Sequence, residues 1–298
     1  MVRIRMSLTR PALPLLGLLL CVPIQALGED SNPKEARMCV ITNWDADCDG
    51  SQRNSWDNMV YGWYHGITDD LPVVHGGHGA AAWVPSGSMV NDDVLDDRFV
   101  DESSYDWGRD NSFVDSGDAV MVGLHGLDSP DDHRWCGRVL WYPSGPGNCN
   151  ANQGHIELGD NDLEFLLLSS CNSMDRDDWW PNWNSSFDGL HQVDGFHGIM
   201  WINSSYAGRY RSFANDAFWI SIADAWLDYL YIHHANNSHD QCPVARNVGT
   251  NGTNSLSRMN HERFNNVYSD PPGLGSPRNH RVRYIKGCDP KGKGALPS

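Results

Sequence analysis

Residues 119–126 read Ala-Val-Met-Val-Gly-Leu-His-Gly, and residues 163–173 read Leu-Glu-Phe-Leu-Leu-Leu-Ser-Ser-Cys-Asn-Ser. Each stretch holds a short, nearly continuous apolar run that leads directly to a reactive side chain, His125 in the first and Cys171 in the second. Short apolar runs of this kind are typical of strands that are buried on both faces of a parallel sheet. Because the carboxyl ends of neighbouring parallel strands meet at one edge of the sheet, we expect His125 and Cys171 to lie close together.

The rest of the chain alternates between short apolar runs and segments with helical periodicity. We predict strands at residues 38–42, 119–124, 163–168, 197–202, 243–248 and 282–285, a hairpin between residues 138–142 and 155–158, and helices at residues 54–66 and 212–232. Residues 76–79 and 85–88 are predicted to be loops. Strands that alternate with helices are typical of an α/β fold with a mainly parallel central sheet covered on both faces.

Residues 1–28 have the composition of a secretory signal peptide. Arg3, Arg5 and Arg10 give a basic start, and an apolar run follows over residues 13–24. Small residues at positions 26 and 28 then lie where a signal peptidase cuts. The apolar run is too short to span a bilayer with margin, and no later stretch is long and apolar enough. We therefore expect residues 29–298 to form a single α/β domain that is secreted, periplasmic or extracellular, with no stable membrane insertion.

The chain is acidic, with 38 Asp and Glu against 22 Lys and Arg and a formal net charge of −16. A surface of this sign repels phosphate backbones, so the composition argues against nucleic acid as a partner. The oligomeric state is left open by the composition.

The cysteine count indicates disulfides and one unpaired thiol. Eight cysteines are present, and removal of Cys21 with the signal peptide leaves an odd number. In an oxidising compartment, all but one of these can pair. Six cysteines allow about 15 arrangements. The arrangement that joins sequence neighbours pairs Cys39 with Cys48, Cys136 with Cys149 and Cys242 with Cys288. It leaves Cys171 free, either as a nucleophile or as a buried inert thiol.

An imidazole and a thiol at adjacent strand ends can act as a catalytic pair. His125 can remove the proton of Cys171, whose thiolate is the nucleophile. Gly126 lets the backbone approach a substrate without an intervening side chain. The amides of Gly126 and Cys171 can bind the oxyanion that forms during acyl transfer. The candidate catalytic residues are therefore His125, Cys171 and Gly126, and we expect neither a cofactor nor a metal ion.

The two motifs resemble those of the caspase-like cysteine peptidases. An apolar strand ending in His-Gly, followed about 50 residues later by an apolar strand ending in a small residue and Cys, is the pattern of caspases, metacaspases, legumains, gingipains and separases. The segment around Cys171 is similar to the CHAT branch, and the likeness over about residues 38–285 is to secreted bacterial domains of the DUF6345 type. The resemblance implies a caspase–hemoglobinase fold, which is a three-layer sandwich around a mainly parallel sheet. It also implies His125 as base, Cys171 as nucleophile, and a peptide or protein as substrate.

The resemblance does not carry a specificity pocket with it. Metacaspases have Asp and caspases have Gln two residues before the cysteine, where this chain has Ser169. Asp128 and Asp175 follow the two motifs closely and would suit a pocket for Lys or Arg. Acidic residues are common throughout the chain, however, so solvated loop carboxylates are the simpler interpretation of both.

Other constellations in the sequence are weaker. Residues 45–50 begin like a calcium loop, but Trp56 stands where such a loop needs a bidentate Glu. Two histidine groups have a spacing that a metal could use, although solvated loop histidines explain them as well: His75 and His78 with His65, and His233 and His234 with His239. A Gly-x-Ser-x-Gly elbow is absent from the sequence, which disfavours a serine hydrolase.

The sequence therefore predicts an exported cysteine peptidase or a related acyl-transfer hydrolase that uses His125 and Cys171. The alternative is a catalytically inactive caspase-like domain that binds a peptide or glycan, because a fold does not by itself secure a function. A third hypothesis, of metal-dependent chemistry, requires a bound zinc or calcium ion.

Overall fold

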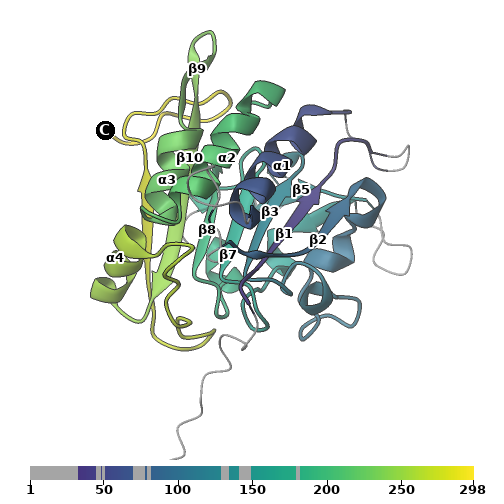
Figure 1. Cartoon of the computed structure of the whole chain (residues 1–298), viewed down its shortest axis with the longest axis vertical. Helices are drawn as coiled ribbons and strands as arrows, with labels where there is room; N and C mark the ends of the chain where they lie inside the picture. The colour runs from purple at the N-terminus through teal and green to yellow at the C-terminus, as the bar shows by residue number, and fades with distance from the viewer. Residues whose placement is uncertain are drawn as a thin grey trace, which may run out of the picture.

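The computed structural model describes residues 33–44, 48, 51–69, 78, 82–128, 134–140, 149–178 and 182–298. Its main sheet is built from β1 (Glu35–Val40), β2 (Val84–Val90), β3 (Ala119–Gly123), β7 (Phe165–Ser169), β8 (Gln192–His197), β9 (Ile232–Asn236), β10 (His239–Gly249) and β11 (Asn279–Tyr284). Within the described residues, the strand order is β11-β10-β8-β7-β3-β1-β2, with β9 paired to β10 (Figure 1).

The part of the main sheet that carries the two motifs is parallel. β1 pairs in parallel with β2 and β3, β3 with β7, and β7 with β8, whereas β10 runs antiparallel to β8, β9 and β11. β3 and β7 are buried along their whole length, as their continuous apolar runs predict. The predicted α/β fold with a mainly parallel central sheet is confirmed.

The α-helices of the described residues form a layer on one face of the main sheet. They are α1 (Ser55–Thr68), α2 (Ala207–Asp216), α3 (Ile222–Leu230) and α4 (Gly252–His261). In Figure 1, α1, α2 and α3 lie side by side in front of the strands. Gly62 allows α1 to approach α2 closely, because a Cβ on this residue would lie 2.4 Å from the Ala207 carbonyl oxygen. Further along the layer, Ala245 of β10 packs with Ala223 of α3 and Met259 of α4.

Short elements cover the opposite face. They are the antiparallel sheet β4 (Gly126–Asp128), β5 (Trp135–Arg138) and β6 (Asn150–Asn152), and 3-10 helices that include η4 (Asp96–Phe99), η5 (Asp110–Ser112), η6 (Gln153–His155) and η8 (Asn182–Ser186). Arg246, which follows Ala245 and therefore points to this face, donates a hydrogen bond to Asn184 of η8. Trp135 of β5 stacks on Trp183 of η8. In the described part of the chain, the third layer is thus made of short elements rather than α-helices.

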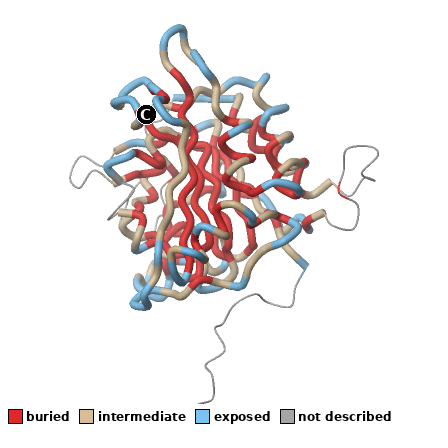
Figure 2. The backbone as a smooth tube through the Cα atoms, turned by 90° about the vertical axis from the view of Figure 1, so that its left-hand side faces the viewer, coloured by how far each residue is buried: buried red, intermediate tan, exposed pale blue. Residues whose placement is uncertain are grey.

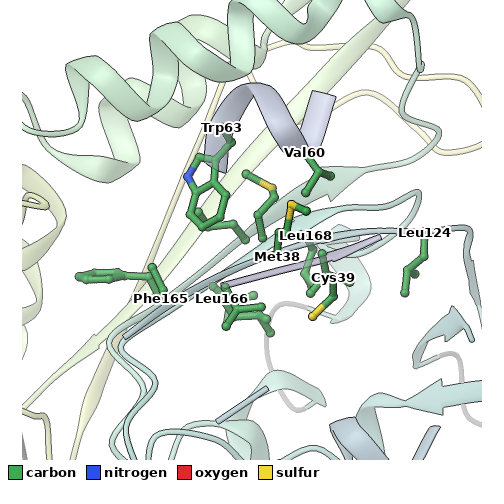
Figure 3. Packing of buried hydrophobic residues seen from close by; sticks show 14 of the residues in the cluster. Met38, Cys39, Val60, Trp63, Leu124, Phe165, Leu166 and Leu168 are labelled. Carbon is green, nitrogen blue, oxygen red and sulfur yellow. The ribbon is translucent and has the colours of Figure 1, made fainter. Parts of the chain in front are cut away.

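The core lies between α1 and the strands, and it continues through the sheet to the other face. Figure 2 shows the central strands as the most continuously buried part of the backbone. Figure 3 shows Trp63 and Val60 of α1 on one side of the strands and Cys39 on the other. All three side chains are fully buried. The strands that deliver the two motifs are therefore held on both faces.

Two predicted elements differ from the structure near the motif edge. The apolar run at 197–202 was expected to be a strand, but β8 ends at His197, and residues 199–202 instead line a pocket. The helix predicted at 212–232 is two helices, because Ser221 has extended backbone and its hydroxyl accepts a hydrogen bond from the amide of Asp224 to start α3. The apolar periodicity continues across the break since both helices cover the same face.

Two further predictions are wrong on the other side of the sheet. Residues 85–88 were expected to form a loop, but they lie in β2, which is an edge strand and is therefore largely exposed rather than apolar. The hairpin predicted between residues 138–142 and 155–158 is shifted, because the pairing is between β5 and β6. Residues 70–77, 79–81 and 141–148, which hold His75 and the end of the predicted hairpin strand, lie outside the described residues.

Two disulfides lie within the described residues, Cys48–Cys149 and Cys242–Cys288. The pairing of Cys242 with Cys288 agrees with the nearest-neighbour arrangement. The proposed pairs Cys39–Cys48 and Cys136–Cys149 are wrong, because Cys48 is bonded to Cys149, and Cys39 is a free thiol buried in β1. Cys171 is also a free thiol, as expected. Disulfides of this kind are typical of oxidising compartments and are consistent with an extracellular protein.

The signal peptide predicted at residues 1–28 lies outside the described residues. Among the helices that the structure describes, none is both long and apolar enough to cross a membrane.

A candidate active site at the carboxyl edge of the sheet

β3 and β7 lie side by side and bring the two motifs to the same edge of the sheet. Gly123 of β3 is in register with Ser169 of β7, and the Leu124 amide donates to the Ser169 carbonyl. His125 and Cys171 follow directly, and both line one pocket of about 200 Å³. Its other lining residues are Arg53, Trp56, Ile199, Met200, Trp201 and Ile202. The structure therefore brings together the two residues that the sequence singled out.

His125 is held by one hydrogen bond and two aromatic rings. Its Nε2 lies 3.0 Å from the Ser51 carbonyl oxygen. The ring centroids of Trp44 and Trp56 lie 4.7 and 4.8 Å from that of the imidazole. Burial lowers the pKa of His125, and the nearby positive charges of Arg53 and Arg138 act in the same direction. The imidazole is therefore neutral at pH 7, and its orientation is fixed.

Cys171 is a protonated thiol in this conformation. Its Sγ donates to the Met200 carbonyl oxygen at 3.7 Å. Burial raises the pKa of Cys171, and the Asp175 carboxylate raises it further. Asn172 has a left-handed φ of 55°, and its amide donates to the Gly198 carbonyl at 2.8 Å, so the chain turns sharply after the thiol. The thiol and the imidazole each have another hydrogen-bond partner but face a common pocket.

Buried serines fix the loop that carries Cys171. The Ser170 hydroxyl accepts a hydrogen bond from the Trp135 indole at 3.1 Å. The Ser173 hydroxyl donates to the Ser170 carbonyl and accepts from the Phe196 amide. Ser169, two residues before Cys171, is fully buried and hydrogen-bonded to the Tyr210 hydroxyl. Ser169 therefore supports the sheet and is not among the residues that line the pocket.

Gly126 occupies a position that tolerates no side chain. A Cβ there would lie 1.9 Å from the Cys171 carbonyl oxygen and 2.4 Å from the Ser170 hydroxyl. The Arg138 amide donates to the His125 carbonyl, so His125 and Arg138 form a hydrogen-bonded pair next to the Gly126–Gly137 pair of β4 and β5. Because the two kinds of pair alternate in antiparallel ladders, the amide of Gly126 points away from β5.

Asp128 and Asp175, the two carboxylates considered for a basic-residue pocket, both bind the chain's own Lys293. The Lys293 ammonium lies 2.6 Å from an oxygen of each. Burial raises the pKa of Asp175, but hydrogen bonds from His197, Gly198 and Lys293 outweigh it, so that its pKa is lowered overall. The pKa of Asp128 is raised, first by burial, and Asp175 adds to the effect. The lysine charge is therefore balanced mainly by Asp175, which is nearly inaccessible to solvent.

The C-terminal segment supports the pocket wall, a role that no local pattern in the sequence signals. The Ile199 amide donates to the Lys291 carbonyl at 3.0 Å, and the Lys291 ammonium lies 5.7 Å from the centre of the Trp201 ring. His197 Nε2 bonds to the Gly294 carbonyl oxygen at 2.8 Å. The disulfide at Cys288 anchors this segment to β10.

Of the histidines considered as metal ligands, His78 is held by other side chains, whereas His233 and His234 each place a ligand atom within 4.8 Å of the other and of Asp240. His78 stacks on Phe218 with centroids 3.6 Å apart, and its Nε2 bonds to Asn215. His233 bonds through Nδ1 to Asp240 at 2.8 Å and stacks on His234. The calcium-like loop at 45–50 lies outside the described residues except for Cys48, which forms a disulfide.

Comparisons with known proteins place the chain in a family. A comparison with curated proteins finds no match. A family model described as a domain of unknown function (DUF6345) matches residues 77–287, which include His125, Gly126 and Cys171 and most of the sheet. The predicted likeness to this family is confirmed, and the chain belongs to the DUF6345 family.

Proposed function

We propose that the protein is an exported cysteine-dependent hydrolase of caspase-like fold that cleaves a peptide or protein by acyl transfer. The observation that carries the proposal is that His125 and Cys171, each at the end of a parallel strand, line one pocket. Trp56, Trp201, Ile199 and Ile202 line the same pocket and give the pair partly apolar surroundings.

The hydrogen bond to Ser51 supports a distinct role for each imidazole nitrogen in the proposed reaction. A carbonyl oxygen can only accept, so Nε2 of the neutral ring carries the proton and donates it to Ser51. Nδ1 then keeps the lone pair and is the basic atom. Since the imidazole is neutral and the thiol is protonated, the reaction starts from a neutral pair rather than from a preformed ion pair.

In the proposed reaction, Sγ of Cys171 attacks the substrate carbonyl carbon while its proton moves to Nδ1 of His125. The amide C–N bond then breaks, and the leaving amine takes that proton. Water, deprotonated by the same nitrogen, hydrolyses the thioester and restores the thiol. The amide of Gly126, which points away from β5 beside the Cys171 loop, is suited to bind the oxyanion together with the amide of Cys171.

A second candidate function is a binding domain that uses the same pocket without turnover. The hydrogen bond from the Cys171 thiol to the Met200 carbonyl favours this alternative, because a thiol held there must move before it can attack. The two candidate functions predict different results when the Cys171 sulfur is removed. A binding domain would still bind its ligand, whereas a cysteine hydrolase would lose turnover.

The test compares wild type with Cys171→Ala on a broad library of fluorogenic peptides. Turnover is expected to fall by at least about 10³-fold in the variant, since it removes the nucleophile. Cys39→Ala is the matched control, because Cys39 is also a free thiol but is fully buried with a pKa raised to about 12. Mass-spectrometric mapping should find iodoacetamide on Cys171 and not on Cys39. Turnover that persists in Cys171→Ala would exclude the cysteine mechanism, and peptide binding without cleavage in wild type would favour the second candidate.

A further inference from the structure

Three aspartates converge at the edge of the sheet opposite to the candidate active site. Asp110 begins η5, Asp115 lies shortly before β3, and Asp160 lies shortly before β7. One carboxylate oxygen from each of the three lies within 4.8 Å of the others. The cluster therefore joins the amino ends of the same two strands whose carboxyl ends carry His125 and Cys171.

Asp110 supplies an oxygen that has no donor. Its side chain is fully buried, and its Oδ1 accepts hydrogen bonds from the Glu102 and Asn111 amides, both at 3.0 Å. In the described part of the chain, Oδ2 of Asp110 has no hydrogen-bond partner. A buried carboxylate oxygen in this condition is costly unless a further group binds to it.

Asp115 organises the chain around the cluster. Its carboxylate is fully buried and accepts hydrogen bonds from the amides of Gly159, Asn161 and Leu163. These contacts bring the segment that holds Asp160 against the segment that leads into β3. The geometry of the three carboxylates is thus fixed by the backbone and not by flexible side chains alone.

The negative charge of the cluster has no basic counterpart among the described residues. None of the three aspartates there forms an ion pair, and the basic side chains nearest in sequence are engaged elsewhere. Arg109 lies 3.7 Å from Asp97, and Arg98 lies over the Phe113 ring. The carboxylates of Asp101 and Asp188 add further negative charge around the site, and Arg278 offsets part of the charge of Asp188.

We propose that Asp110, Asp115 and Asp160 bind a calcium ion. The donors are all carboxylate oxygens, which hard cations prefer, and two oxygens at about 2.3–2.6 Å from one calcium ion lie at most about 5 Å apart. Zinc is disfavoured because, among the described residues, the cluster contains no nitrogen or sulfur ligand. Asp160 is exposed and borders an open pocket of about 470 Å³, so water can complete the coordination sphere.

A calcium ion at this position would clamp the two strands together at their amino ends. It would neutralise the mutual repulsion of the carboxylates and tie η5 to the segment before β7. The expected result is a more stable folded state with calcium than without it.

The test uses the full chain after treatment with EDTA and removal of the chelator. Addition of CaCl₂ to 10 mM is expected to raise Tm by about 5 °C for a site with a Kd of about 10⁻⁴–10⁻³ M. Titration calorimetry should give one calcium ion per chain. Asp160→Asn is the main variant, since its exposed side chain can be replaced without disturbing the core. Asp92→Asn, at an exposed aspartate on η3 (Asn91–Asp93), is the matched control.

Asp160→Asn is expected to lose the calcium-dependent rise in Tm, while its Tm without calcium stays at or above that of wild type because a repelling charge is gone. Asp92→Asn is expected to behave as wild type in both conditions. A purely structural role of Asp160, such as a proton shared with Asp115, would instead lower Tm equally with and without calcium. That result, or an unchanged calcium response in Asp160→Asn, would overturn the proposal.

Discussion

At the scale of single residues, the candidate site depends on a close contact between two backbone segments at Gly126. An alanine there would place its Cβ 1.9 Å from the Cys171 carbonyl oxygen, which is backbone and cannot move aside cheaply. We expect Gly126→Ala to lower the free energy of unfolding by about 1–3 kcal/mol, measured by urea denaturation. Gly208→Ala is the control, because Gly208 lies in α2 with open space around the added methyl group. It should be neutral or stabilising by about 0.5–1 kcal/mol. Equal free energies of unfolding for Gly126→Ala and Gly208→Ala would contradict the close approach of Gly126 to the Cys171 carbonyl.

Residue patterns predicted the members of the site that lie on the two strands and missed those that do not. His125 and Cys171 were accessible because an apolar run before a polar side chain already specifies a strand end. The site also uses the backbone carbonyl oxygens of Ser51 and Met200 and the long side chain of Lys293. A backbone carbonyl is present at every residue, so no residue type signals its use. Their contacts depend on the packing of distant segments, which a local pattern does not encode.

At the scale of elements, Lys293 links the segments that follow β3 and β7 through Asp128 and Asp175. We expect Lys293→Met to lower the free energy of unfolding by about 2 kcal/mol at pH 7, because it leaves the buried Asp175 carboxylate without its cation. Lys291→Met is the control, since the Lys291 ammonium lies over the face of Trp201 and forms no ion pair among the described residues. Its loss should be about 0.5 kcal/mol or less.

The pH dependence of this difference follows from the two pKa shifts. The pKa of Asp175 is lowered in the folded state, so its contribution is present above its unfolded pKa of about 4 and is lost as the pH falls below it. The pKa of Lys293 is raised: burial opposes this, but hydrogen bonds to both carboxylates outweigh it. Its contribution is present below its unfolded pKa of about 10.4 and is lost above it. The difference between wild type and Lys293→Met should therefore be constant between about pH 5 and pH 10 and shrink on either side. A pH-independent difference would argue against the ion pairs.

Strands that are buried on both faces were predicted well, and segments that are buried on one face or exposed were predicted poorly. β3 and β7 are buried on both faces, so a continuous apolar run located them. Residues 199–202 are as apolar as a strand, but β8 ends before them, at His197. The chain then turns so that these residues line the pocket, and the Ile199 amide donates to the Lys291 carbonyl. β2 was missed for the opposite reason, since an edge strand needs few apolar residues. The acidic cluster was equally invisible, because Asp110, Asp115 and Asp160 are separated along the chain and meet only through the strand pairing.

At the scale of the whole molecule, the two disulfides join distant parts of the chain, and Cys48–Cys149 encloses the longer loop. It connects the segment before α1, which carries Ser51, to the residue just before β6, across a sequence separation of 101 residues, whereas Cys242–Cys288 spans 46. In the chain-entropy model, a longer loop gives a larger stabilisation, with a difference of about 0.7 kcal/mol for these two lengths.

We expect Cys48→Ala/Cys149→Ala to lower the free energy of unfolding by about 4 kcal/mol, slightly more than Cys242→Ala/Cys288→Ala. Urea denaturation of both variants with and without dithiothreitol measures this, because each variant should respond only through its remaining disulfide. Peptide mapping under non-reducing conditions is the direct check. A disulfide-linked peptide that joins Cys136 to Cys149 would refute this connectivity. In that case, no bond from Cys48 to Cys149 would hold the Ser51 segment beside His125.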